Sequence, residues 1–243
     1  MAATDALLYW AERGLTLQAV MAVSALPADV LNGLTPAQRR LRQLVLLGHV
    51  GGAVWPQALA EAPDDDHPID TAVHRWVVRG MGAHAPGVAW ECVYPGDTAL
   101  SLIRLGECAG WHHPSPFLQG VDAEWGSWFA YRAVLLANTY WPLTPRRERR
   151  SPCLDCVGQP CVAACPAQAL GVDQALGLQR CSDHRLHRVS SCEDRCLARL
   201  ACPVGAEHRY SAVQLQHHYR HSLAAIRAWR TDASAIQLSG TGS

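Results

Sequence analysis

The spacing of apolar residues predicts strands that alternate with helices in the first half of the chain. Three short, almost continuously apolar runs are typical of buried strands: residues 15–23, 43–48 and 87–94. Apolar side chains recur at helical spacing in three further segments: residues 4–13, about 70–83 and 98–108. The apolar run at 127–137 fits either a strand or a helix. This interleaving predicts an α/β fold that binds ligands near the carboxyl ends of its strands.

The second half of the chain has a different pattern. Near the C-terminus one apolar stripe predicts a helix, with members three or four residues apart: Ala212, Leu215, Tyr219, Leu223, Ile226 and Trp229. The charged, proline-flanked run 145–152 is typical of a linker. We therefore expect an α/β domain over 1–150, a small cysteine-rich module over 151–210, a helix over 211–230 and a flexible tail over 231–243.

The composition favours a folded protein that meets neither membranes nor nucleic acids. Of 243 residues, 49% are hydrophobic and 17% charged, which excludes a disordered chain. The 21 basic residues, all arginine, balance 21 acidic ones, so no net positive charge attracts nucleic acid. The sequence contains no signal-peptide pattern and no run of about 18 uncharged apolar residues. We expect a cytoplasmic protein whose thiols stay reduced.

The cysteines carry the most specific signal. Of the 10 cysteines, all but Cys92 and Cys108 lie between residues 153 and 202. They form two runs, C-x2-C-x4-C-x3-C-P from residue 153 and C-x10-C-x3-C-x5-C-P from residue 181. In two-cluster ferredoxins the cysteine before proline commonly binds the other run's cluster. Two runs that each end in Cys-Pro therefore predict two 4Fe–4S clusters with crossed ligation.

Crossed ligation assigns each cysteine to a cluster. The first cluster takes Cys153, Cys156, Cys161 and Cys202. The second takes Cys165, Cys181, Cys192 and Cys196. Structural zinc is the alternative, because paired cysteine motifs also form tetrahedral sulfur sites. Several arginines in the segment either offset the charge of an anionic cluster or form a solvated basic face: Arg180, Arg185, Arg188, Arg195 and Arg199.

An α/β domain followed by a small ferredoxin-like dicluster domain resembles the epoxyqueuosine reductase family, whose members are cobalamin-dependent iron–sulfur enzymes. Asp97-Thr98-Ala99 and Gly126-Ser127-Trp128-Phe129 are similar to two motifs of that family. The segment from Gly126 to Arg132 also resembles the B12-trafficking chaperone that removes the upper ligand of cobalamin. Both relatives use a nitroreductase-like α/β domain, so the resemblance implies that fold, with a cobalamin pocket, for residues 1–150.

The resemblance also implies roles for individual residues. Asp97 corresponds to the proposed proton donor of the reductases. The implied cofactor-binding residues are Gly126, Ser127, Trp128, Phe129 and Arg132. The chain departs from the reductases at Leu100, where they have proline. Only about 40 residues follow the last cysteine, so we expect it to lack their tRNA-binding repeat domain. We therefore expect no action on tRNA.

Simpler interpretations of the same residues remain open. Asp97 follows Pro-Gly and fits a helix N-cap as well as a general acid. Arg132 fits a surface ion pair as well as a clamp for an anionic group. The aromatic side chains Trp125, Trp128 and Phe129 suit a core as well as a wall against a macrocycle. On the last helix, two interpretations fit His217, His218 and His221: they bind a metal, or they are exposed to solvent.

The predicted function is that of an iron–sulfur oxidoreductase, with cobalamin as a second cofactor. An external donor of the ferredoxin or flavodoxin type reduces one cluster, and the other cluster reduces a corrinoid or small-molecule acceptor near residues 97–132. Two alternatives stay open: an electron-transfer module without cobalamin, and a chaperone that reduces or handles corrinoids.

Overall fold

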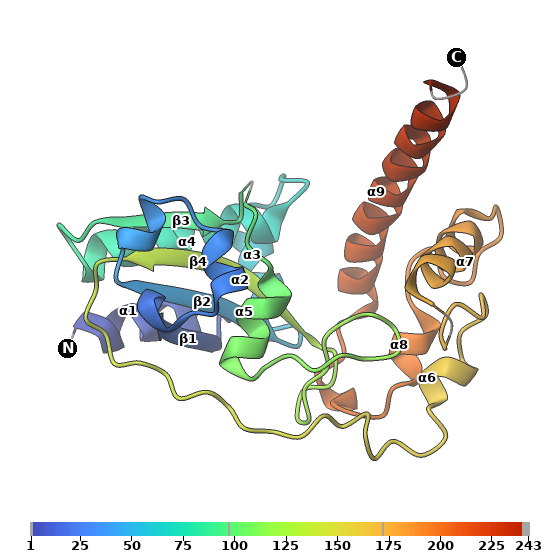
Figure 1. Cartoon of the computed structure of the whole chain (residues 1–243), viewed down its shortest axis with the longest axis horizontal. Helices are drawn as coiled ribbons and strands as arrows, with labels where there is room; N and C mark the ends of the chain where they lie inside the picture. Colours follow the sequence, from blue (N-terminus) through green and yellow to red (C-terminus); the bar gives the residue numbers. More distant parts are fainter. Residues whose placement is uncertain (1, 97, 172, 240–243) are drawn as a thin grey trace.

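The computed structural model describes residues 2–96, 98–171 and 173–239 (Figure 1). Its centre is a four-stranded sheet in the order β1-β2-β4-β3, with every neighbouring pair antiparallel. The strands are β1 (Leu17–Ala22), β2 (Gln43–Val50), β3 (Trp90–Tyr94) and β4 (Phe129–Ala137). The three predicted strands are confirmed. The ambiguous run is a strand, because it pairs with β2 on one side and β3 on the other.

The antiparallel pairing divides the carboxyl ends of the strands between two edges of the sheet, with the ends of β2 and β3 at one edge. Carboxyl ends of strands share one edge only where the strands run parallel. Here β1 and β2 are adjacent and antiparallel, and β4 runs opposite to both of its neighbours. The start of β4 therefore lies beside the ends of β2 and β3, and this edge is the one that faces the rest of the chain (Figure 1).

Helices cover both faces of the sheet. One face packs against α1 (Ala2–Ala11), α3 (Val54–Glu61) and α4 (Pro68–His84), and the other against α2 (Ala28–Asn32) and α5 (Leu102–Ala109). On β2, Val45 and Leu47 join the first core while Leu44 and Leu46 join the second. A strand buried on both sides needs apolar residues at consecutive positions, which explains the continuous apolar run. Short 3-10 helices occupy Val23–Ala25, Gln38–Arg40 and Ala206–His208.

The C-terminal part begins after a long extended segment. Residues 138–159 form no helix or strand and run along one side of the molecule toward α6 (Pro160–Ala163) (Figure 1). The helices α7 (Gln174–Leu186), α8 (Leu197–Ala201) and α9 (Ala212–Ser239) follow. The last helix extends beyond its predicted end at residue 230, as far as Ser239, through a segment containing the helix-forming residues alanine, leucine and glutamine. No helix in the described part of the chain is long and apolar enough to cross a membrane.

Candidate functional site

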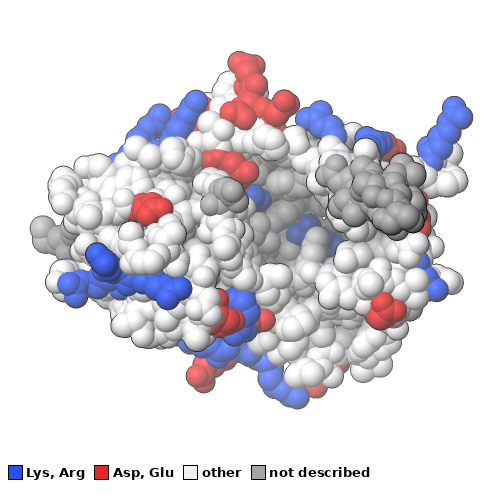
Figure 2. Space-filling model, turned by 45° about the horizontal axis from the view of Figure 1, so that its top comes forward, with Lys and Arg blue, Asp and Glu red and all other residues white. Residues whose placement is uncertain are grey.

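A cavity of about 390 Å³ lies between the sheet and the C-terminal helices. Figure 2 shows it as a hollow in the middle of one face, with arginine atoms inside. Its lining comes from the start of β4, the end of β3, the loop after α5, and α8 and α9. The polar residues that matter for its chemistry are Tyr94, His112, Tyr131, Arg132, Arg199 and His218. The size suits a small-molecule site that is open on one side.

The structure divides the predicted cofactor-binding residues into two groups. Ser127, Phe129 and Arg132 line the cavity, whereas Gly126 and Trp128 do not. Asp97, the predicted acid, lies outside the described residues. The motif around Gly126 therefore contributes partly to the cavity and partly to packing.

Gly126 allows two backbone segments to meet. Its φ of +59° is in the left-handed region, and a Cβ atom there would overlap the carbonyl oxygen of Val204. Gly205, with φ of +65°, makes the reciprocal approach to the backbone of Trp125. Only glycine accepts both the conformation and the proximity at no steric cost. The two glycines join the sheet domain to the segment that carries the last cysteine.

Trp128 lies in the joint between the two halves of the chain. It is fully buried, in a cluster with Tyr210, Leu215 and Tyr219. The guanidinium of Arg199 lies over its ring, 4.2 Å from the centroid. The same guanidinium donates to the hydroxyl of Ser127 at 3.2 Å and to its carbonyl at 2.6 Å. For Trp128 the interpretation as a core residue is therefore correct.

Arg132 brings an incompletely paired charge to the cavity. Its side chain is 13% exposed, and its Nη1 lies 3.9 Å from Oδ1 of Asp70, at the limit of an ion pair. Its Nε atom is buried and has no hydrogen-bond partner among the described residues. Burial, followed by the charge of Arg132, lowers the pKa of His218 to about 3. At neutral pH this wall of the cavity therefore combines a permanent cation with a neutral imidazole.

The cysteines come together in the two predicted sets. Cys153, Cys156, Cys161 and Cys202 surround a narrow cavity of about 20 Å³. A second cavity, of about 250 Å³, is bordered by Cys165, Cys181, Cys192 and Cys196. All ten cysteines are free thiols. The second set therefore encloses the larger space.

Electrostatic coupling between thiols reflects the same grouping. Burial raises the pKa of Cys153, and the neighbouring thiols of Cys202 and Cys156 raise it further. Burial likewise raises the pKa of Cys181, with Cys196 as the next contribution. Among the residues that the structure describes, no three His, Cys, Asp or Glu side chains converge closely enough to hold a single metal ion.

Sequence reasoning missed several residues of the cavity. Arg199, Tyr210 and His218 come from the C-terminal half, which we expected to contribute clusters and a packing helix. His218 is half-buried, borders the cavity and packs against Tyr210, so it is not a solvated helix position. Arg199 was recognisable as one of five arginines near the cysteines, but nothing in its spacing separates a buried arginine from a solvated one.

Buried His49 makes the fold sensitive to acid. Burial, aided by the charge of Arg132, holds the pKa of His49 well below its usual value. As the pH falls, His49 takes up a proton more readily in the unfolded chain than in the folded one. The contribution of neutral His49 to stability is therefore fully present above about pH 6.5 and is lost as the pH falls. We expect the unfolding free energy to fall by up to about 1.4 kcal/mol per pH unit below that point. Urea unfolding between about pH 7.5 and 5 measures this slope.

Two histidine variants separate this effect from general acid sensitivity. His49→Gln can still donate to the carbonyl of Gly51, the present partner of Nδ1 at 2.9 Å, and removes the titration. It should therefore reduce the slope by the contribution of His49 and leave that of His218, whereas His74→Gln, at an exposed position on α4, should leave the slope unchanged. Equal slopes in both variants would assign the acid sensitivity to other groups.

Comparison with known proteins places the fold. No family model and no curated protein matches the chain. Epoxyqueuosine reductase from Bacillus subtilis superposes with a TM-score of 0.56 and 14% identity, covering 86% of this chain and 66% of that one. A second epoxyqueuosine reductase structure, with an epoxyqueuosine-modified tRNA-Tyr stem loop, superposes with a TM-score of 0.56 and 13% identity. The match covers 88% of this chain and 68% of that one. The chain thus spans about two-thirds of the reductases.

A B12-trafficking protein matches over a greater share of its length. The C. elegans protein CblC superposes with a TM-score of 0.51 and 12% identity, covering 94% of this chain and 96% of that one. Sequence identities this low show a similar fold and do not show a shared activity. The resemblance drawn from the motifs is confirmed at that level: the chain has a mixed α/β fold similar to those of epoxyqueuosine reductase and of CblC.

Proposed function

We propose that this chain is an iron–sulfur oxidoreductase that relays electrons through two 4Fe–4S clusters to a corrinoid or small-molecule acceptor in the 390 Å³ cavity. The observation that carries the proposal is the grouping of eight cysteines, distant in sequence, into two sets of four free thiols. The role of the clusters when bound is to accept and donate single electrons. The role of this chain's residues is to hold them near the cavity.

The spread of the thiols supports clusters over zinc. A structural zinc ion needs four sulfurs about 2.3 Å from one point. In a cubane cluster each thiolate binds a different iron, so the four sulfurs lie farther apart. Among the described residues no three metal-binding side chains converge on one ion, yet four thiols border each cavity. This arrangement fits a multi-iron group better than a single ion.

Shared residues give the relay an order. The second cysteine set's cavity and the main cavity have three lining residues in common: Gln119, Arg199 and His218. Phe117 borders the cavities of both cysteine sets. The first set is therefore the outer one, toward an external donor of the ferredoxin or flavodoxin class, and the second set is the inner one.

The main cavity suits an acceptor with a flat body and an anionic group. Phe129 and Tyr131, with ring centroids 5.8 Å apart, provide aromatic surface. The unpartnered Nε of Arg132 can donate to a carboxylate or phosphate oxygen. A corrinoid has both features, and the open side of the cavity leaves space for a ligand larger than the cavity itself (Figure 2).

A corrinoid-handling role is the second candidate. It is favoured by the match to CblC over nearly the whole of both chains, whereas the match covers only 66% of the B. subtilis reductase. Under this proposal the acceptor is the corrinoid itself, which the protein reduces or strips of its upper ligand. Action on tRNA is not proposed, because the chain has no net positive charge.

Titration of the anaerobically purified full chain with cobalamin tests the cavity. We expect the absorption spectrum of the corrin to change on binding. Replacing Arg132 with methionine should weaken the affinity about tenfold, since a charge-assisted hydrogen bond contributes about 1.5–3 kcal/mol. Arg150→Met is the matched control, because Arg150 is exposed and pairs with Asp155 far from the cavity lining.

The outcomes separate the candidate functions. An unchanged corrin spectrum, in protein that contains both clusters, would exclude cobalamin as a ligand and favour an electron-transfer module. Equal affinities for the two arginine variants would place the corrinoid elsewhere on the molecule.

A further inference from the structure

The two cysteine sets differ in the charge around them. The cavity of the inner set, Cys165, Cys181, Cys192 and Cys196, is also lined by Arg185, Arg195 and Arg199. Among the described residues, none that lines the outer set's cavity is charged. Two chemically identical groups placed in these cavities would therefore experience different electrostatic potentials.

Arg185 is buried and held on three sides. It is 7% exposed, although it lies on α7 in a polar helix. Its Nε donates to the carbonyl of Cys192 at 3.1 Å, its Nη2 to the carbonyl of Tyr219 at 3.0 Å, and its Nη1 to the hydroxyl of Ser222 at 2.8 Å. Every one of these partners is neutral, so the positive charge is fixed in place but not neutralised.

Arg199 is equally buried and connects the inner set with the main cavity. It is 7% exposed, and it borders both cavities. Its backbone N–H donates to the sulfur of Cys196 at 3.5 Å. Its guanidinium donates to Ser127, just before β4, and lies 4.2 Å from the ring centroid of Trp128 and 5.0 Å from that of Tyr210. This side chain therefore spans the space between the thiols and the site of the acceptor.

Two buried cations without counter-charges are costly. Within the described ranges, no carboxylate lies within ion-pair distance of Arg185 or Arg199. Burying a charge without an opposite partner costs several kcal/mol. An anionic group beside both guanidiniums would offset that cost, and the four thiolates of the inner set with their cluster supply one. An added electron makes this group more negative, and the arginines stabilise it further.

We propose that Arg185 and Arg199 are positioning residues that give the inner centre a higher reduction potential than the outer centre. This difference in potential directs electrons from the outer set toward the main cavity. The inference rests on the proposed function, since it requires both clusters. In each transfer the outer centre loses one electron and the inner centre gains it. A low-potential one-electron carrier protein restores the outer centre, and the acceptor in the cavity removes the electron from the inner one.

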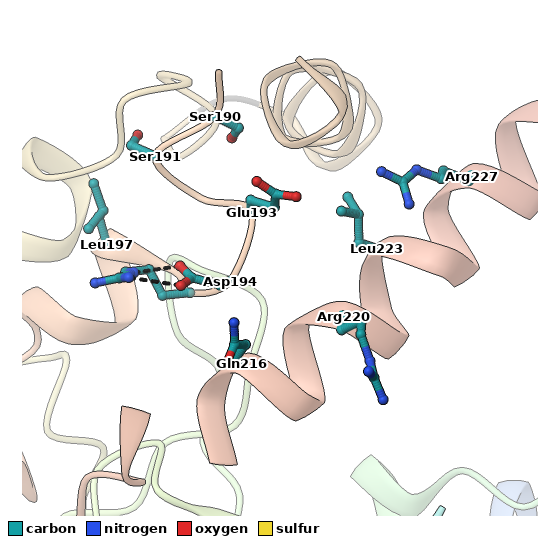
Figure 3. A pocket seen from close by; sticks show the side chains of 10 residues that line it. Ser190, Ser191, Glu193, Asp194, Leu197, Gln216, Arg220, Leu223 and Arg227 are labelled. Atoms are coloured by element: carbon teal, nitrogen blue, oxygen red, sulfur yellow. Dashed lines mark hydrogen bonds and ion pairs between the residues drawn. The ribbon is translucent and has the colours of Figure 1, made fainter. Parts of the chain in front are cut away.

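Arg195 provides the matched control. It also borders the inner cavity, but its guanidinium is paired with Asp194, with Nε 2.6 Å from Oδ1, and its side chain is 50% exposed. Arg195 and Asp194 also line an open cavity of about 720 Å³, where Figure 3 shows Asp194 across from Arg220 and Arg227 of α9. Because the charge is neutralised locally and screened by water, its removal should change little.

A redox titration followed by electron paramagnetic resonance tests the proposal. The sample is the anaerobically purified full chain with both clusters, and Cys153→Ser assigns the signals by removing the outer centre. In the unmodified chain the inner centre should have the higher midpoint potential. Arg199→Gln and Arg185→Gln should each lower that potential by about 59 mV, a tenfold change in the one-electron equilibrium. Arg199→Lys, which keeps the charge, should recover part of the shift.

The expected controls are an unshifted outer centre in every arginine variant and an unshifted inner centre in Arg195→Gln. The proposal is overturned if the outer centre has the higher potential in the unmodified chain, or if Arg195→Gln shifts the inner centre as much as Arg199→Gln does. Failure of the proposed function looks different, because the unmodified chain would then give no cluster signal at all.

Discussion

Replacing Cys202 with serine is expected to remove the same centre as replacing Cys153, although the two residues belong to different runs of the sequence. Each substitution should lower the iron content by about half, from about eight to about four atoms per chain, because a cluster that lacks one of its four thiolates is rarely retained. The structure places both residues on one cavity, and proximity of Cys202 contributes to the raised pKa of Cys153.

Double variants make this prediction specific for crossed ligation. Cys153→Ser combined with Cys202→Ser should cost no more iron than either change alone, because both residues serve one centre. Cys153→Ser combined with Cys165→Ser should remove nearly all iron, although these two residues belong to the same run. The reverse result would assign each cluster to a single run. Cys92→Ser is the control, since Cys92 packs against the sheet core and should leave the iron content unchanged.

Replacing Gly126 with alanine is expected to destabilise the protein by about 3 kcal/mol. The left-handed conformation costs a residue with a Cβ atom about 1–2 kcal/mol. The overlap with the carbonyl oxygen of Val204 adds a packing cost of about 1–3 kcal/mol, since backbone atoms cannot rotate away. The change also separates the two halves of the chain at the joint beside Trp128, so any ligand affinity of the cavity between them should fall together with the stability.

Urea unfolding followed by circular dichroism measures this loss, with Gly82→Ala as the matched control. Gly82 lies within α4, and a Cβ atom there would meet nothing within 4 Å. Alanine is the better helix former, so the control should be stabilised by up to about 1 kcal/mol. A Gly126→Ala protein as stable as the unmodified chain would show that the backbone contact does not constrain the joint.

The pattern of apolar residues predicted the elements well and their arrangement poorly. The runs at 15–23, 43–48 and 87–94 are strands because both faces of the sheet are covered, which requires apolar residues at successive positions. The same pattern is typical of buried parallel strands, so it favoured an arrangement with one carboxyl edge. Strand direction depends on the connections, and nothing in the apolar runs encodes it.

The candidate site, too, was only partly predictable from the sequence. The positions of the cysteines were predictable because chemistry imposes their number and spacing, and the Cys-Pro steps indicated the crossed grouping. The motif residues were harder: Gly126 and Trp128 fit a corrin pocket by resemblance, but they form the joint between the two halves. The burial of Arg185 and Arg199 could not be predicted, because an arginine near cysteines has the same sequence context whether it faces water or a cluster.

Quantification of iron, acid-labile sulfide and zinc in freshly purified, anaerobic protein tests the central claim most directly. We predict about eight irons and about eight sulfides per chain, with no stoichiometric zinc. One or two zinc ions per chain with no labile sulfide would contradict the account, because the eight thiols would then be structural and nothing in the molecule would carry electrons to the cavity.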